Sequence, residues 1–129
     1  MRAIDTNVLV RFLTGDDPDQ AARARAAIMQ GPVYVSSTVL LETAWVLRSV
    51  YAIAPHDIAA ALRRFGGLAN AVLEEPARIA QALDWVEQGM DVADALHLAK
   101  ASPCEAMLTF DERFIRAAEG VSSIPVCAV

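Results

Sequence analysis

Short apolar segments alternate with helical patterns along the chain, and this alternation limits the fold more than any other feature of the sequence. Such an order is typical of α/β units, in which successive strands lie parallel and are joined by helices. The sequence therefore predicts an α/β fold with a mostly parallel central sheet flanked by helices. Strands are expected at residues 3–4, 33–35, 71–73, 106–109 and 125–129, and helices at residues 7–13, 18–29, 55–65, 76–87, 91–101 and 112–118, with a further helix from its capping residues 36–38 through residue 50.

Proline, glycine and capping residues mark where these elements begin and end. Asp17 and Pro18 are typical of the N-cap and the first position of a helix. Gly31 and Pro32 then interrupt the chain before the next strand. No repeat, low-complexity tract or long linker divides the sequence, and 129 residues are enough to bury one core. We therefore expect a single domain that spans residues 1–129.

The charge balance restricts how this chain could contact nucleic acid. It has sixteen acidic and eleven basic residues, which gives a net charge of −5. A broad basic face is therefore not expected, unless several acids are gathered around a metal ion. Asp5 interrupts the apolar start, so no secretory signal is expected, and no charge-free stretch reads as a membrane span. Two cysteines without CxxC spacing favour a reducing cytoplasm.

Four aspartates occupy positions that also suit helix termini. Asp5 follows the first expected strand, Asp111 follows the strand at 106–109, and Asp91 precedes a helix. Capping of the first helical N–H groups would explain each of these three residues taken alone. Asp94 falls in the first turn after Asp91, where an acid interacts favourably with the helix dipole. Position alone therefore leaves a structural and a functional role open for each of them.

Glu42 lacks such a local explanation. Its neighbours one helical turn away are Thr38, Val39, Trp45 and Val46, and none of them is basic. No ion pair can therefore form within the helix. We expect Glu42 to flank the apolar face of its helix rather than the solvent side, and a salt bridge to a distant arginine is the structural alternative.

Considered together, the acids indicate one site. In open α/β sheets, binding sites form just beyond the carboxyl ends of the strands. Four acids come from segments that can converge at such an edge: Asp5, Glu42, Asp94 and Asp111. Clustered carboxylates repel one another unless a cation lies between them, and oxygen ligands in this number suit Mg²⁺ or Mn²⁺ rather than zinc. We therefore expect Asp5 to be a metal ligand.

The stretches around these acids resemble the motifs of the PIN-domain ribonucleases, specifically the VapC-type toxins of bacterial toxin–antitoxin pairs. The matching stretches are AIDTNVLVRFL, SSTVLLETAWVL, DVADALHLA and LTFDERF, in the order of the family and at about its spacing. Each stretch alone is weakly specific, whereas the four in order are quite specific. The resemblance covers essentially the whole chain.

The resemblance implies a small Rossmann-like α/β/α domain that binds Mg²⁺ or Mn²⁺ and cleaves RNA as an endoribonuclease. It also implies a homodimer and a cognate antitoxin protein as partners. Three residues match secondary positions beside the site: Asp91, Thr6 and Thr109. The catalytic and metal-binding acids carried over motif by motif are Asp5, Glu42, Asp94 and Asp111.

The residues are consistent with that chemistry. A bound metal can lower the pKa of a water that attacks the phosphodiester, and it can stabilise charge on the phosphate oxygens. The carboxylates mainly position the metal. The net charge is consistent with such a site, because the excess of five acids over basic residues equals the four site acids together with Asp91. Contact with RNA would then depend on metal and on scattered arginines.

Two other functional classes stay open at this point. A catalytically silent PIN-like module could bind RNA or a partner protein without cutting. An acid-site phosphohydrolase or phospho-receiver domain would require an acid at Asn7 or a lysine after a late strand, whereas Lys100 lies inside an expected helix. Zinc and serine chemistry are disfavoured, because His56 and His97 are the only histidines and no GxSxG occurs.

Overall fold

A parallel three-stranded sheet organises the first part of the chain. The computed structural model describes all 129 residues, which divide into two units, Met1–Pro76 and Ala77–Val129. In the first unit, β1 (Arg2–Ala3), β2 (Val33–Val35) and β3 (Ala71–Leu73) lie in the order β1-β2-β3, and each pair is parallel. The carboxyl ends of these strands therefore share one edge of the sheet.

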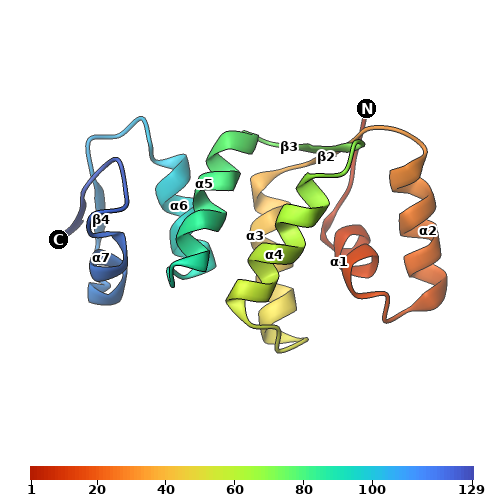
Figure 1. Ribbon diagram of the computed structural model, residues 1–129, viewed down its shortest axis with the longest axis horizontal. Coiled ribbons are helices and arrows are strands. Elements are labelled where there is room, and N and C mark those ends of the chain that lie inside the picture. Colours follow the sequence, from red (N-terminus) through yellow and green to blue (C-terminus); the bar gives the residue numbers. More distant parts are fainter. The chain divides into compact units, whose positions relative to one another are not determined.

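Four helices complete the first unit: α1 (Thr6–Thr14), α2 (Pro18–Met29), α3 (Ser37–Ser49) and α4 (Pro55–Gly66). Figure 1 shows α2 beside α1 and α4 beside α3, and α1 also packs against α3. Their apolar faces and β2 supply the buried core of this unit, which includes Leu9, Ile28, Val33, Val35, Leu40, Leu47, Ile58 and Phe65.

Local sequence explains where these helices begin and end. Asp17 caps α2 by accepting a hydrogen bond from the Gln20 N–H at 3.1 Å, and Pro18 occupies the first turn, where no donor is needed. Ser36 caps α3 through a hydrogen bond from the Val39 N–H at 3.3 Å. Gly15 ends α1 with a φ of 65°, a conformation that glycine adopts without strain.

The second unit contains α5 (Pro76–Glu87), which starts at the boundary, followed by α6 (Val92–Lys100), β4 (Met107–Thr109), α7 (Glu112–Ala118) and β5 (Val126–Ala128). β4 and β5 form a parallel pair, and α7 packs against both strands. Trp85 is buried in α5 and donates its indole N–H to the carbonyl of Val121 at 3.3 Å. The unit is therefore a second α/β element with its own apolar core.

The α/β fold and the parallel strands predicted from the sequence are confirmed. The bounds of α2, α5, α7, β2 and β3 are those expected, whereas β1 lies one residue earlier than expected and β4 and β5 are shorter. α6 begins at Val92 rather than at 91, because Asp91 stays outside the helix as its N-cap. The single domain stays a prediction. None of the helices combines the length and the apolar composition needed to cross a membrane.

One buried hydroxyl group in α3 has no hydrogen-bond partner. Thr43 is fully buried at 0% exposure, and its Oγ1 atom accepts and donates no hydrogen bond. Folding removes this hydroxyl from water without replacing the hydrogen bonds it had there, which costs roughly 1–3 kcal/mol. The unpaired hydroxyl thus belongs to the residue that directly follows Glu42 in α3.

We expect Thr43→Val to stabilise the protein, because it replaces the unpaired hydroxyl with a methyl group of similar shape. The free energy of unfolding should rise by about 1 kcal/mol in urea denaturation. Thr43→Ala should lower it instead, because it leaves a cavity. A valine variant that is less stable than the wild type would show that the hydroxyl has a partner in solution.

Candidate functional site

Asp5 lies at the carboxyl end of β1 and caps α1. Its Oδ1 atom accepts a hydrogen bond from the Val8 N–H at 3.1 Å. This bond fixes the side chain at the sheet edge, because the N–H groups of a first helical turn have no partner inside the helix. The other carboxylate oxygen makes no hydrogen bond, and the side chain is exposed. Capping and metal binding are therefore compatible at Asp5, since each uses a different oxygen.

Glu42 lies in the second turn of α3, the helix that follows β2 and packs against α1. It is exposed, so the expectation that it flanks the apolar face is wrong. The reason is that the helix buries Leu40, Thr43, Ala44 and Leu47, which leaves Glu42 on the other side. No salt bridge forms at Glu42, so the structural alternative of a distant arginine is not observed either. Its carboxylate is therefore open to a ligand.

Glu74 is a further acid at this edge, and it belongs to none of the four sequence motifs. It follows β3, and its carboxylate accepts hydrogen bonds from the Ser37 N–H at 3.3 Å and the Ser37 hydroxyl at 3.0 Å. Tyr34 also donates its hydroxyl to Glu74 at 3.3 Å. These bonds tie the end of β3 to the start of α3. Glu74 therefore has a structural role that positions the helix carrying Glu42.

The second unit contains Asp91, Asp94 and Asp111. Asp91 caps α6 by accepting hydrogen bonds from the N–H groups of Ala93 and Asp94 at 3.0 and 3.2 Å. Asp111 follows β4 and caps α7 in the same way, with the Arg113 and Phe114 N–H groups at 2.9 and 3.3 Å. Each cap again uses a single carboxylate oxygen. The capping interpretation of both residues is therefore confirmed, and one oxygen of each stays open.

The pKa of Asp94 is raised above the ordinary value of an aspartate. Burial is the largest cause, because it disfavours the charged form, and the negative charges of Asp91 and Asp111 raise the pKa further. The nearby His97 partly offsets this effect by lowering the pKa. Asp94 thus lies close enough to Asp91 and to Asp111 for its charge to interact with theirs. A cation beside Asp94 would offset both the burial cost and the repulsion.

The two threonines expected beside the site differ in what they do. Thr109 accepts a hydrogen bond from the Asp111 N–H at 3.0 Å through its hydroxyl, and this bond orients the turn between β4 and α7. Thr6 is buried at the first position of α1, directly after Asp5. Both threonines therefore adjoin a capping aspartate.

The donor atoms of these residues fit a hard divalent cation. The open oxygens belong to carboxylates, which suit Mg²⁺ or Mn²⁺, and no cysteine or buried histidine accompanies them. The acids divide between the units, with Asp5 and Glu42 in the first and Asp94 and Asp111 in the second. The structure places no group of three or more acidic, histidine or cysteine side chains to hold one ion. The four-carboxylate site therefore stays a prediction.

A parallel α/β chain with open carboxylates directly after its strands is of the class in which acidic, metal-dependent sites form. The chain belongs to the PIN domain family, whose profile matches residues 3–120 and thus almost the whole sequence. PIN domains are typically nucleases and commonly depend on a divalent metal. None of the curated proteins compared with the chain matches it. The family confirms the nuclease-type fold expected from the sequence.

We expect Asp94→Asn to raise the melting temperature of the metal-free protein at pH 7. A raised pKa means that the folded state favours the protonated acid, so stability is lost as pH rises from the ordinary carboxyl pKa of about 3.9 through the raised value. Asparagine does not ionise, so the variant avoids this loss of stability. Its melting temperature in EDTA should be about 1–3 °C higher than that of the wild type.

The gain should disappear near pH 3, where the wild-type acid is protonated in both states. Asp57→Asn is the matched control, because Asp57 lies in the first turn of α4 as Asp94 does in α6, but is exposed. Equal effects of the two substitutions at both pH values would contradict the account of Asp94.

Proposed function

We propose that the protein is a metal-dependent endoribonuclease that acts as the toxin of a type II toxin–antitoxin pair, of the VapC type. The observation that carries this proposal is a set of open carboxylates placed directly after parallel strands, in a chain of the PIN domain family. The four motifs that resemble VapC-type toxins contain these same acids.

Asp5, Glu42, Asp94 and Asp111 would hold the metal, with Asp91 in a secondary position. Mg²⁺ or Mn²⁺ bound there would supply an acidified water and electrostatic stabilisation of the phosphate. Asp5 and Asp111 are suited to positioning, because the helix N–H groups restrict their rotation. Asp94 is suited to binding a cation, because a bound cation would offset the burial cost and the repulsion by acidic neighbours that raise its pKa. One of the four carboxylates could also accept the proton that hydrolysis releases.

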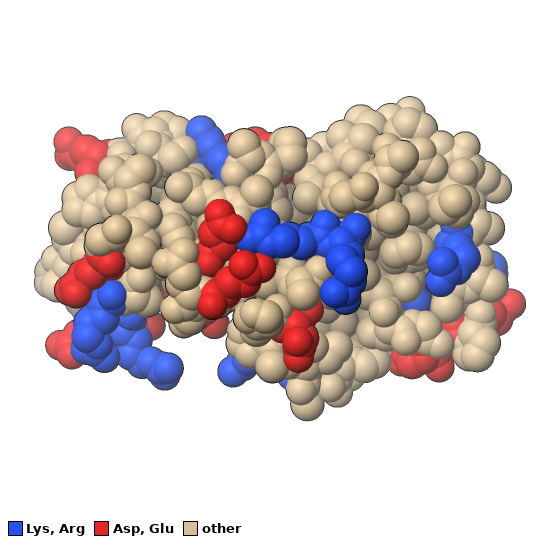
Figure 2. All heavy atoms as spheres, in the orientation of Figure 1, with Lys and Arg blue, Asp and Glu red and all other residues tan.

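RNA is the proposed substrate, and we expect the protein to contact it through a few separate residues. Figure 2 shows basic side chains in small groups interspersed with acidic ones on the face in view, without a broad basic surface. Affinity for RNA would then come from bound metal and from individual arginines rather than from general attraction to the phosphate backbone.

A cognate antitoxin and a second copy of the chain are the proposed protein partners. A hollow of about 260 Å³ lies among Phe12, Leu13 and Phe65, with Arg25 and Arg64 also lining it. Apolar side chains accompanied by arginines suit an amphipathic segment that carries acidic residues. The homodimer is proposed from the family resemblance alone.

Divalent metal should stabilise the native protein if the carboxylates bind it. We expect millimolar Mg²⁺ or Mn²⁺ to raise the melting temperature by about 3–6 °C at saturation, because the ion binds the folded site selectively. Asp5→Asn should abolish most of this increase, whereas Asp57→Asn should retain it. An unchanged increase in the Asp5 variant would remove Asp5 from the metal site.

Cleavage of RNA tests the activity directly. We expect the purified, antitoxin-free protein to cut folded tRNA or rRNA into discrete products with Mg²⁺ or Mn²⁺ and not with EDTA. Asp94→Asn should lower the rate by about 100-fold or more, because it removes a proposed metal ligand.

The matched control is again Asp57→Asn, which should cut at the wild-type rate. Equal cutting by the wild type and the Asp94 variant would point to a contaminating nuclease. RNA that stays intact with metal, across tRNA, rRNA and mRNA substrates, would favour the silent PIN-like module over a nuclease.

A further inference from the structure

A hollow of about 460 Å³ lies beside Asp5, between α1 and α2. Asp5, Asn7 and Arg11 line it from the side of α1, and Gln20 and Arg23 line it from α2, together with small apolar residues. All of these residues belong to the first unit. Among them, only Asp5 is a site residue expected from the sequence motifs. The hollow therefore adjoins a proposed metal ligand, and four other polar side chains also line it.

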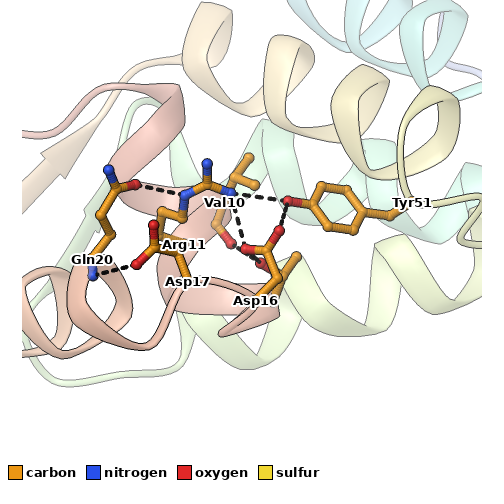
Figure 3. Close-up of polar contacts among 7 residues, drawn as sticks. Val10, Arg11, Asp16, Asp17, Gln20 and Tyr51 are labelled. Atoms are coloured by element: carbon orange, nitrogen blue, oxygen red, sulfur yellow. Dashed lines mark hydrogen bonds and ion pairs between the residues drawn. The ribbon is translucent and has the colours of Figure 1, made fainter.

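Arg11 is held in one orientation by a network of hydrogen bonds, shown in Figure 3. Its Nε atom donates to the Gln20 side-chain oxygen at 2.7 Å, and Nη1 donates to Asp16 at 2.9 Å and to the Tyr51 hydroxyl at 3.1 Å. Tyr51 in turn donates to Asp16 at 2.6 Å. The Nη2 atom takes no part in this network. One edge of the guanidinium is thus fixed and still free to donate.

Gln20 and Asn7 add amide groups to the same hollow. The oxygen of Gln20 is occupied by Arg11, so its NH₂ group is directed away from that bond and is free to donate. Asn7 is exposed and makes no side-chain hydrogen bond, so both its donor and its acceptor are available. Two amides beside a fixed guanidinium can distinguish patterns of donors and acceptors, as they do on the edges of nucleobases.

Arg23 supplies a positive charge at the hollow. Its side chain is 77% exposed and lies 3.6 Å from Asp19 in a surface pair. Such a pair is weak, so Arg23 can exchange it for a phosphate at little cost. The volume of the hollow lies within the range of sites for small ligands. The residues that line the hollow thus suit one nucleotide, because Arg23 can bind a phosphate and the two amides can bind the edge of a base.

We propose that this hollow binds one nucleotide of single-stranded RNA and that Asn7 and Gln20 select its base. The strand must be single, because a base pair would occupy the edge that the amides read. The inference rests on the proposed function in that RNA is the substrate and Asp5 a metal ligand. The hollow then holds the nucleotide next to the phosphodiester that is cut, so its base preference contributes to the cleavage sequence.

The test is a titration of the full-length protein in EDTA with the four 5′-ribonucleoside monophosphates and with inorganic phosphate, followed by ¹⁵N NMR. We expect the side-chain amide signals of Asn7 and Gln20 to shift saturably with the nucleotides, and affinity to differ by about threefold or more between bases. Inorganic phosphate should shift the Arg23 signal and leave the two amides in place.

Matched arginine variants locate the phosphate. Arg23→Gln should weaken nucleotide binding by about three- to tenfold, because it removes one charge-assisted contact. Arg116→Gln makes the same change in another surface pair, in which Arg116 lies 3.8 Å from Glu112 in α7, and Arg116 does not line the hollow. This control should bind within about twofold of the wild type. Melting temperatures would confirm that both variants are folded.

Any of three results would overturn the inference. The first is no shift of the Asn7 and Gln20 amide signals at saturating nucleotide, and the second is equal weakening of nucleotide binding by the two arginine variants. The third is a saturable shift of these amide signals by an acidic peptide when nucleotides leave them unmoved. Neither metal nor cleavage enters this experiment, so its failure leaves the nuclease proposal standing. Conversely, nucleotide binding without any RNA cleavage would support the hollow and count against the nuclease.

Discussion

The hydrogen bonds between aspartate side chains and helix N-termini are the interactions on which both the fold and the proposed site depend. Asp5, Asp91 and Asp111 each start a helix by accepting one or two backbone N–H groups through one oxygen. These bonds stabilise the helices and restrict the side chains at the same time. The second oxygen of each residue stays open, so structural and functional roles do not compete for the same atoms.

Local signals predicted most of the secondary structure, because proline, glycine and capping residues act within a few residues of sequence. Asp17 with Pro18 fixed the start of α2, and Asp91 fixed that of α6. The exposure of Glu42 was not predictable, since it depends on which face of α3 the neighbouring helices cover. Glu74 was missed for a similar reason, because its partners Tyr34 and Ser37 are about forty residues away in the sequence.

The hollow beside Asp5 illustrates the limit of motif reasoning most clearly. Arg11 and Gln20 are nine residues apart on different helices, and only the packing of α1 against α2 brings them into contact. Tyr51 comes from beyond the end of α3 and completes the network. No spacing rule within one helix or strand describes such a set. The acids could be proposed from sequence because each follows a strand, whereas this hollow required the tertiary structure.

Capping also bears on how strongly such carboxylates would bind metal. The N-terminus of a helix carries a partial positive charge, which favours an ionised aspartate but also repels an approaching cation. A capping carboxylate is therefore a well-positioned but weakened ligand, and one or two of them would hold Mg²⁺ or Mn²⁺ poorly. Asp94 and Glu42 accept no helix N–H group in this way. These two acids would supply the remaining attraction for the cation. The proposed site therefore needs both capping and non-capping acids.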